Sequence, residues 1–166
     1  MKTISVDIAL RKSGLVILDG KEIKHKDTLK VNSKLDRTDS LVHIYSTYEK
    51  IFSEVLEKDP EALVCMEDVM TFGHLKAAVA IETARTSATL AYRHVCGRMG
   101  VRPRILYATP SEVKHHFTGK RGAKKPELFE KFMRMHPEFV NEALTEDEMD
   151  ALVLAIYCLE KKIDRE

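Results

Sequence analysis

The chain opens on residues that alternate between apolar and polar with a period of two, which is typical of β-strands. Residues 3–9 (TISVDIA) and 14–18 (GLVIL) are rich in β-branched residues and predict two strands. Asp19-Gly20 follows the second of them, and glycine accepts the positive φ of a type I′ turn. The pattern therefore predicts a β-hairpin whose returning strand, residues 21–31, has one polar face.

Apolar residues take up helical spacing after residue 40. They recur at positions 41, 44, 48, 51, 52, 55 and 56, which predicts a helix. Ser40 is its expected N-cap, at the end of a loop over residues 32–40. Asp59-Pro60 ends the helix, because the residue before a proline is disfavoured in the α region. Residues 62–67 (ALVCME) then form a continuous apolar run, which suits a strand covered on both faces.

Helix-capping residues mark two helix starts in the second half of the chain. Thr109 and Glu112 form a capping box with Pro110 at the first helical position, and Thr145 and Glu148 form another. Apolar spacing completes this half. It predicts helices over residues 75–98, 109–117, 126–136 and 145–161, and a strand over residues 104–108.

This order of elements predicts the fold class. A hairpin and a third strand, followed by helices that alternate with single strands, indicate an α/β domain. We expect a mixed five-stranded sheet flanked by helices on both faces. A chain of 166 residues is long enough to bury one proper core. No repeat or low-complexity segment interrupts it, so residues 1–166 are expected to form a single domain.

Composition excludes several classes of protein. The formal net charge is +1, so nucleic-acid binding has to come from a local patch. Cys65, Cys96 and Cys158 lack the spacing of metal ligands and are interpreted as buried residues in a reducing compartment. No apolar run approaches the ~20 residues of a membrane span, and Asp7 and Arg11 interrupt any signal peptide. We expect a cytoplasmic protein that does not bind membranes.

Four acidic residues lie where predicted strands end or where the last helix begins: Asp7, Glu67, Asp147 and Asp150. If the first and fourth strands are neighbours and the last helix crosses them, the four carboxylates converge. Like charges repel in a low-dielectric pocket, and divalent cations remove that repulsion. Mg²⁺ prefers carboxylate oxygen, with Mn²⁺ as the alternative. Two such ions about 4 Å apart can activate a water molecule and stabilise the leaving oxygen of a phosphodiester.

Each acid also has a purely structural interpretation. Acidic residues in the first turn of a helix offset its dipole by about 0.3–1 kcal/mol each. Asp7 can be an edge-strand charge, and Glu67 can be a surface residue at a strand end. The metal-site interpretation is favoured by the four residues taken together. Asp150 supports it most, because this residue lies beyond the first residues of the helix on a stripe that should be buried.

Residues 114–125 carry a run of basic side chains with no acid between them. Two glycines in this segment let backbone amides approach phosphate, and neutralised phosphates supply much of DNA affinity. We expect the segment to lie beside the acids, with Lys114, on a capped helix, stabilising charge that develops on the phosphate. A solvated loop is the alternative. The basic residues are Lys114, His115, His116, Lys120, Arg121, Lys124 and Lys125.

Five segments, taken in order, resemble the RuvC-type Holliday-junction resolvases. They are ISVDIALRKSGLVIL, with Gly14 seven residues after the acid, LVCMEDV, IETARTSA, YATPSEVKHHFTGKRGAKK and DEMDALVLAIYC. Together they span residues 3–158, nearly the whole chain. No single motif is specific, and the ordered set carries the resemblance.

The resemblance implies a ribonuclease H-like fold, a homodimer, and Mg²⁺-dependent cutting of four-way DNA junctions with two ions in each active site. It implies that Asp7, Glu67, Asp147 and Asp150 bind the metal, and that Lys114 also serves catalysis. It further implies a set of DNA-binding positions. These are Met70, Phe72, Arg85, Lys114, Lys120, Arg121, Lys124 and Lys125.

Two departures from the family pattern bear on these expectations. The family has Pro-Gly after the first aspartate, whereas Ile8 and Ala9 follow Asp7 here. Family members also have a base-stacking aromatic residue three positions after the glutamate, where this chain has Met70, with Phe72 two residues further on. In both respects the chain resembles the compact, divergent resolvases of bacteriophages, which act in the cytoplasm of the host cell.

The predicted helix over residues 75–98 carries many small residues that permit close approach of two backbones. One of its faces is expected to pair with a second copy across a two-fold axis, or to pack on the sheet. The small residues are Ala77, Ala78, Ala80, Ala84, Ala88 and Ala91.

The sequence thus predicts an endonuclease that uses metal-activated water to make paired symmetric nicks in four-way junctions. Three alternatives remain open. The fold is compatible with a nuclease for other branched DNA or for an RNA/DNA hybrid, and with a junction-binding module that does not cut. An actin-like half-domain shares the hairpin opening, but no second phosphate-binding hairpin follows it.

Overall fold

The computed structural model describes residues 1–68 and 75–163. Met70 and Phe72, the expected base-stacking positions, lie outside the described residues. The strands are β1 (Lys2–Asp7), β2 (Lys12–Asp19), β3 (Glu22–Lys30), β4 (Leu63–Glu67) and β5 (Ile105–Ala108). The helices are α1 (Arg37–Leu56), α2 (Leu75–Met99), α3 (Pro110–Thr118), α4 (Lys125–Met135), the 3₁₀ turn η1 (Pro137–Phe139) and α5 (Glu146–Ile163).

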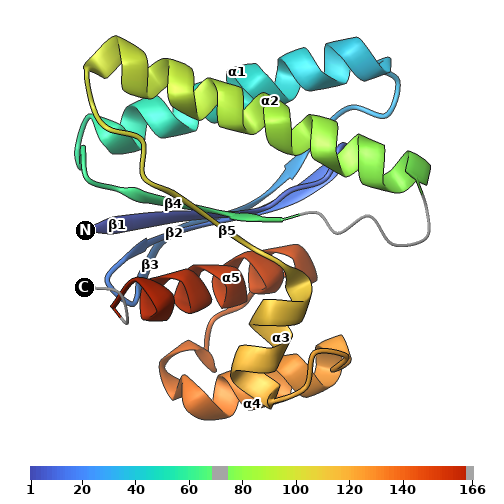
Figure 1. Ribbon diagram of the computed structural model, residues 1–166, viewed down its shortest axis with the longest axis vertical. Coiled ribbons are helices and arrows are strands. Elements are labelled where there is room, and N and C mark those ends of the chain that lie inside the picture. Colours follow the sequence, from blue (N-terminus) through green and yellow to red (C-terminus); the bar gives the residue numbers. More distant parts are fainter. Residues whose placement is uncertain (69–74, 164–166) are drawn as a thin grey trace.

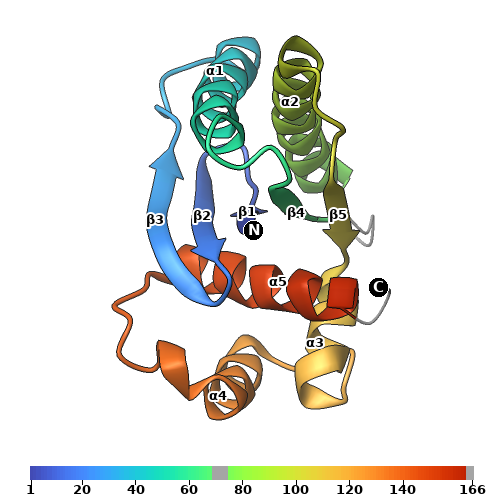
Figure 2. The same cartoon turned by 90° about the vertical axis from the view of Figure 1, so that its left-hand side faces the viewer.

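The strands form one mixed sheet in the order β3-β2-β1-β4-β5. The β1–β2 and β2–β3 pairs are antiparallel, while the β1–β4 and β4–β5 pairs are parallel. Helices α1 and α2 cover one face, and α5 crosses the other with α3 and α4 beyond it (Figure 1). The view along the sheet shows the same three layers (Figure 2). The mixed five-stranded sheet with helices on both faces, expected from the sequence, is confirmed.

Alternation along the central strands gives each face its own core. Ile4 and Val6 of β1 pack with Val64 and Met66 of β4 against α1 and α2. Cys65, between those two β4 residues, packs on the α5 side. The alternate residues of β1 and β4 therefore point to α5. The last residue of each strand is one of these.

The hairpin forms at the expected place but with a different turn. Asp19 pairs with Glu22, so the two loop residues are Gly20 and Lys21 rather than Asp19-Gly20. Gly20 has φ +59°, and no non-glycine residue described has a positive φ. A positive φ at only the first loop position is the pattern of a type II′ turn, so the expected type I′ turn was wrong.

Helix α1 begins earlier than expected. Its N-cap is Asp36, whose side chain accepts a hydrogen bond of 2.8 Å from the backbone N–H of Asp39. Ser40, the expected N-cap, lies inside the first turn and is buried. Its hydroxyl donates to the Asp36 carbonyl and accepts from Arg11, so a tertiary contact occupies the side chain that the local pattern assigned to capping.

Both predicted capping boxes are confirmed. The Thr109 hydroxyl accepts from the N–H of Glu112, while the Glu112 carboxylate accepts from the N–H of Thr109. Thr145 and Glu148 make the same reciprocal pair at the start of α5. The second box matters for the site, because it fixes where α5 begins on the sheet.

The remaining expectations concern cysteines and membrane spans. All three cysteines are free and buried, as interpreted from their spacing. Within residues 1–68 and 75–163, no helix has both the length and the apolar character that crossing a membrane requires.

Candidate active site

Two parallel strands bring the first pair of acids together. Val6 of β1 lies in register with Met66 of β4, and Asp7 and Glu67 are the next residues of these strands. Because Val6 and Met66 point to the α1–α2 core, Asp7 and Glu67 point to the α5 side. Both acids are half-buried. The convergence expected for neighbouring first and fourth strands is present.

Helix α5 approaches these acids through a contact with Gly14. Gly14 pairs with Asp7 across the β1–β2 ladder. A β-carbon at position 14 would lie 1.9 Å from the Asp147 carbonyl oxygen and 2.3 Å from its carbon. Only glycine lets the first turn of α5 lie this close to the sheet. This contact delivers Asp147 and Asp150 to the carboxyl ends of β1 and β4.

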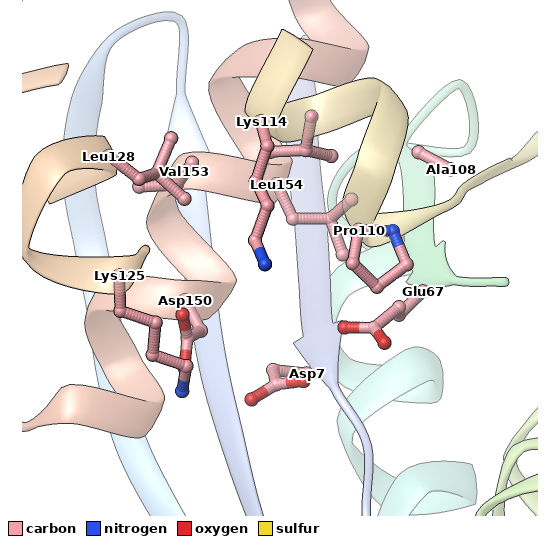
Figure 3. A pocket seen from close by; sticks show the side chains of 11 residues that line it. Asp7, Glu67, Ala108, Pro110, Lys114, Lys125, Leu128, Asp150, Val153 and Leu154 are labelled. Carbon is pink, nitrogen blue, oxygen red and sulfur yellow. The ribbon is translucent and has the colours of Figure 1, made fainter. Parts of the chain in front are cut away.

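The acids Asp7, Glu67 and Asp150 share one pocket with the basic residues Lys114 and Lys125. The pocket has a volume of about 260 Å³. In Figure 3 the three carboxylates lie around one hollow, with the Lys114 ammonium reaching toward it from α3. The rest of the lining is mostly apolar: Ala108, Pro110, Val113, Leu128, Val153 and Leu154.

Burial and mutual repulsion raise the pKa values of these three acids. Burial, followed by the charges of Asp150 and Asp147, raises the pKa of Asp7 to about 6 against the partial opposition of Lys125. Burial and the charges of Asp7 and Asp150 raise the pKa of Glu67 to about 7. Burial also raises the pKa of Asp150. The pocket is therefore a place where negative charge is unfavourable until a cation enters.

Two lysines neutralise the aspartates of α5. Lys125 donates hydrogen bonds of 2.6 Å to Asp150 and 2.8 Å to Glu146. Burial alone would lower the pKa of Lys125, but these carboxylates raise it above its ordinary value. Lys12, at the start of β2, forms an ion pair with Asp147. Asp147 is thus held beside the pocket rather than in its lining.

Lys12 was missed at the sequence level. It follows Asp7 by five residues and resembles any surface lysine at the start of a strand. No local pattern revealed its role, because its place opposite Lys30 on β3 follows from the observed register and not from the turn predicted at Asp19-Gly20. Like charges directly opposite each other on two strands are destabilising. The ion pair with Asp147 offsets the repulsion between Lys12 and Lys30.

The remaining basic residues divide between the pocket and its surroundings. Lys114 lines the pocket, as expected, and Lys120 donates to Glu127 at 2.8 Å. Arg121 and Lys124 are exposed on the segment between α3 and α4. Arg85 lies on α2 and pairs with Asp68 and Glu82, both acidic residues of this chain.

The donor set fits a hard divalent cation. Carboxylate oxygens are the protein ligands that Mg²⁺ and Mn²⁺ take, and Asp7, Glu67 and Asp150 supply them where their charges need neutralisation. The side chains are not yet in a ligand arrangement. Across the described parts of the chain, no three His, Cys, Asp or Glu residues are grouped so as to hold a metal ion. Lys125 and Lys12 instead form ion pairs with Asp150 and Asp147.

Comparison with solved structures identifies the fold. Thermus thermophilus RuvC in complex with a Holliday junction substrate superposes with a TM-score of 0.74 and 18% identity, over 99% of this chain and 96% of that one. The chain has the RuvC fold. RuvC from the same organism, in a second structure, gives a TM-score of 0.72 at 18% identity, with 99% and 97% coverage. This likeness confirms the ribonuclease H-like fold that the family resemblance implied.

A more distant RuvC-fold neighbour is the yeast mitochondrial Holliday junction resolvase Ydc2. Its TM-score is 0.58 at 10% identity, over 92% of this chain and 75% of that one. No protein-family model matches the sequence, and no curated protein matches it either. The likeness is thus carried by the backbone path, at a low sequence identity.

Replacing Gly14 by alanine should destabilise the folded protein by disturbing the packing of α5 on the sheet. The added β-carbon would meet the Asp147 backbone at 1.9 Å, so α5 has to move off the sheet. We expect a loss of about 1–3 kcal/mol in the free energy of unfolding, measured by urea denaturation. Gly97→Ala is the control, because nothing lies within 4 Å of its β-carbon. Equal stability of the two variants would contradict this packing.

The acid pocket should make metal-free stability fall with rising pH. Asp7 and Glu67 have pKa values of about 6 and 7 in the folded protein, above ordinary values of 3.8 and 4.5. The folded state therefore binds more protons than the unfolded chain between about pH 4 and pH 7, and the two groups lower the free energy of unfolding over that window.

Asp7→Asn isolates this effect. In EDTA at pH 7.5 the variant should be more stable than the wild type by on the order of 1–2 kcal/mol, with the difference vanishing near pH 4. Chemical denaturation across this pH range measures it, with the exposed Asp27→Asn as control. A variant less stable than the wild type at pH 7.5 would show that Asp7 carries no electrostatic strain.

Proposed function

We propose that this protein is a metal-dependent, structure-selective endonuclease that resolves four-way DNA junctions. The observation that carries the proposal is the shared pocket of Asp7, Glu67 and Asp150 with Lys114 and Lys125 at its edge. The fold adds support. The Thermus thermophilus RuvC structure that superposes with a TM-score of 0.74 is a complex with a Holliday junction substrate. Acids beside lysines suit a phosphodiester, which needs both metal ligands and partners for phosphate oxygen.

Asp7, Glu67 and Asp150 would hold Mg²⁺, with Mn²⁺ as the alternative and two ions as the expected number. Asp147 would join them on leaving Lys12. When bound, the ions would lower the pKa of a water molecule and offset charge on the phosphate.

The chain's own residues account for the other requirements of hydrolysis. Lys114 extends from the capped helix α3 into the pocket, where its ammonium can neutralise a phosphate oxygen. Apolar side chains such as Val113 and Leu154 line the same space and exclude water, which strengthens each charge interaction there. Lys125 is the second cation at this site, where it pairs with Asp150 and Glu146, and we propose that it also contacts the phosphate backbone.

Exposed cations continue from the pocket along the segment between α3 and α4. Lys120, Arg121 and Lys124 are exposed there, within a few residues of Lys125. We propose that they follow the phosphates of the junction arms. Binding through such contacts weakens steeply with salt, so the affinity for a junction should depend on ionic strength.

We also propose a homodimer in which each protomer is one nuclease domain. Ala84, Ala88 and Ala91 are buried against the protein's own core, so these alanines pack on the sheet side. The opposite face of α2 exposes Leu75, Val79 and Leu90, with exposed fractions of 75%, 39% and 56%. These three lie within about 60° of one another around the helix. A two-fold interface on this apolar stripe would present two sites to a symmetric junction.

The nuclease proposal is tested with a synthetic four-way junction and Mg²⁺. We expect paired symmetric nicks, mapped on a sequencing gel, and a loss of at least about 10³-fold in rate for Asp7→Asn and Glu67→Gln. Asp27→Asn, an exposed aspartate away from the pocket, serves as the matched control and should cut normally. Intact junctions at every metal concentration would reject the proposal.

The same assay separates the alternative substrates. A flap and an RNA/DNA hybrid are added as competitors at equal concentration. Preferential cutting of either would assign the site to another nucleic acid. Junction binding without metal-dependent cutting would instead indicate a binding module whose acids are structural.

The dimer is tested by sedimentation of Leu90→Glu. A buried carboxylate at a two-fold interface faces its own copy, so we expect the dimer dissociation constant to rise by about tenfold or more. Val42→Glu is the control, because Val42 is 59% exposed on α1. A wild-type monomer, or equal dimerisation of both variants, would contradict the interface on α2.

A further inference from the structure

Arg85 binds the residue that immediately follows Glu67. From α2, its Nη1 donates a hydrogen bond of 2.8 Å to Asp68 Oδ1. Its Nε and Nη2 donate to Glu82 Oε2 at 3.1 and 2.6 Å. The Arg85 side chain is only 17% exposed. All three guanidinium nitrogens are therefore engaged within the protein.

An aromatic ring and a backbone bond complete this arrangement. The guanidinium carbon lies 5.0 Å from the ring centre of Tyr107, within range of a cation–π interaction. The Tyr107 hydroxyl is 3.2 Å from that of Thr89, one turn along α2 from Arg85. The backbone N–H of Asp68 donates to the Ala108 carbonyl at 2.8 Å. Asp68 is thus fixed through its backbone by β5 and through its side chain by α2.

The local charge favours an internal role for Arg85 over a DNA contact. One guanidinium faces two carboxylates, so the cluster carries a net charge of −1 and offers little attraction to phosphate. The planar guanidinium fork instead suits two fixed acceptors at once. This departs from the DNA-binding role that the family resemblance implied for Arg85.

We propose that Arg85 is a positioning residue for the acid pocket. By holding Asp68, it fixes the end of β4 and keeps the Glu67 carboxylate turned toward Asp7. The inference rests on the proposed function in one respect, namely that Glu67 is a metal ligand. Residues that orient a ligand from outside the metal shell typically change metal affinity by about 10–100-fold when they are replaced.

The test is a calorimetric Mn²⁺ titration of the full chain without DNA. Arg85→Met removes the charge and the hydrogen bonds while keeping side-chain length, and we expect Mn²⁺ affinity to fall about tenfold or more. Arg85→Lys keeps one cation and should give an intermediate loss. Arg98→Met is the matched control on the same helix, where Arg98 pairs with Ser53 and Glu49, and its affinity should equal the wild type.

A parallel measurement of metal-free junction binding against salt distinguishes the two roles. Positioning predicts that Arg85→Met leaves the affinity and the salt dependence unchanged. A lost phosphate contact would lower the slope of log affinity against log salt by about 0.9. That result, or an Mn²⁺ affinity equal to the wild type, would overturn the inference.

The Asp68→Asn variant tests the same hydrogen bond from the side of its acceptor. It removes the charged acceptor and should reproduce the loss of Mn²⁺ affinity even if Arg85→Met does not fold. A normal affinity in this variant would also overturn the inference. Because the titration contains no DNA, failure of the proposed function appears in the cleavage assay, whereas failure of the positioning role appears in the titration.

Discussion

The repulsion among half-buried carboxylates is the constraint on which the rest of the site depends. Burial raises the pKa values of Asp7 and Glu67 to about 6 and 7, so placing both beside Asp150 has a cost that the fold has to offset. Two lysine ion pairs offset part of it at α5. Among the described residues, the acids at the ends of β1 and β4 hydrogen-bond to each other and are attracted by Lys125 without forming an ion pair with it. Negative charge in this pocket is therefore only partly neutralised by the protein's own cations.

The architecture keeps these acids together despite that cost. The parallel β1–β4 pairing fixes Asp7 and Glu67 side by side, and hydrogen-bonded register cannot shift by one residue without moving every core side chain to the wrong face. Gly14 and the Thr145–Glu148 capping box fix the start of α5 against the same sheet edge. Backbone contacts thus set the positions of these acidic residues.

Much of this was predictable because periodicity and capping are local. Alternating apolar and polar residues predicted the strands, and Thr109 and Thr145 predicted the starts of two helices. The structure confirms both helix starts. The predicted start of α1 was wrong because Ser40 hydrogen-bonds to Arg11, 29 positions away. No local pattern reveals such a contact. The same limit applies to the site. Asp7, Glu67 and Asp150 carried a signal as strand-end and helix-start acids, whereas the pairings made by Lys12 and Arg85 required tertiary geometry.

Helix α5 joins stability and function in one element. Its residues 151–156 are buried between the sheet and the outer helices, so its register is held by the core. Asp150 directly precedes that buried stretch and cannot withdraw from the pocket without displacing it. The backbone of Asp147, one turn earlier, lies against Gly14, and its side chain forms an ion pair with Lys12. The core therefore holds one aspartate at the pocket, while the side chain of the other is held beside it by Lys12.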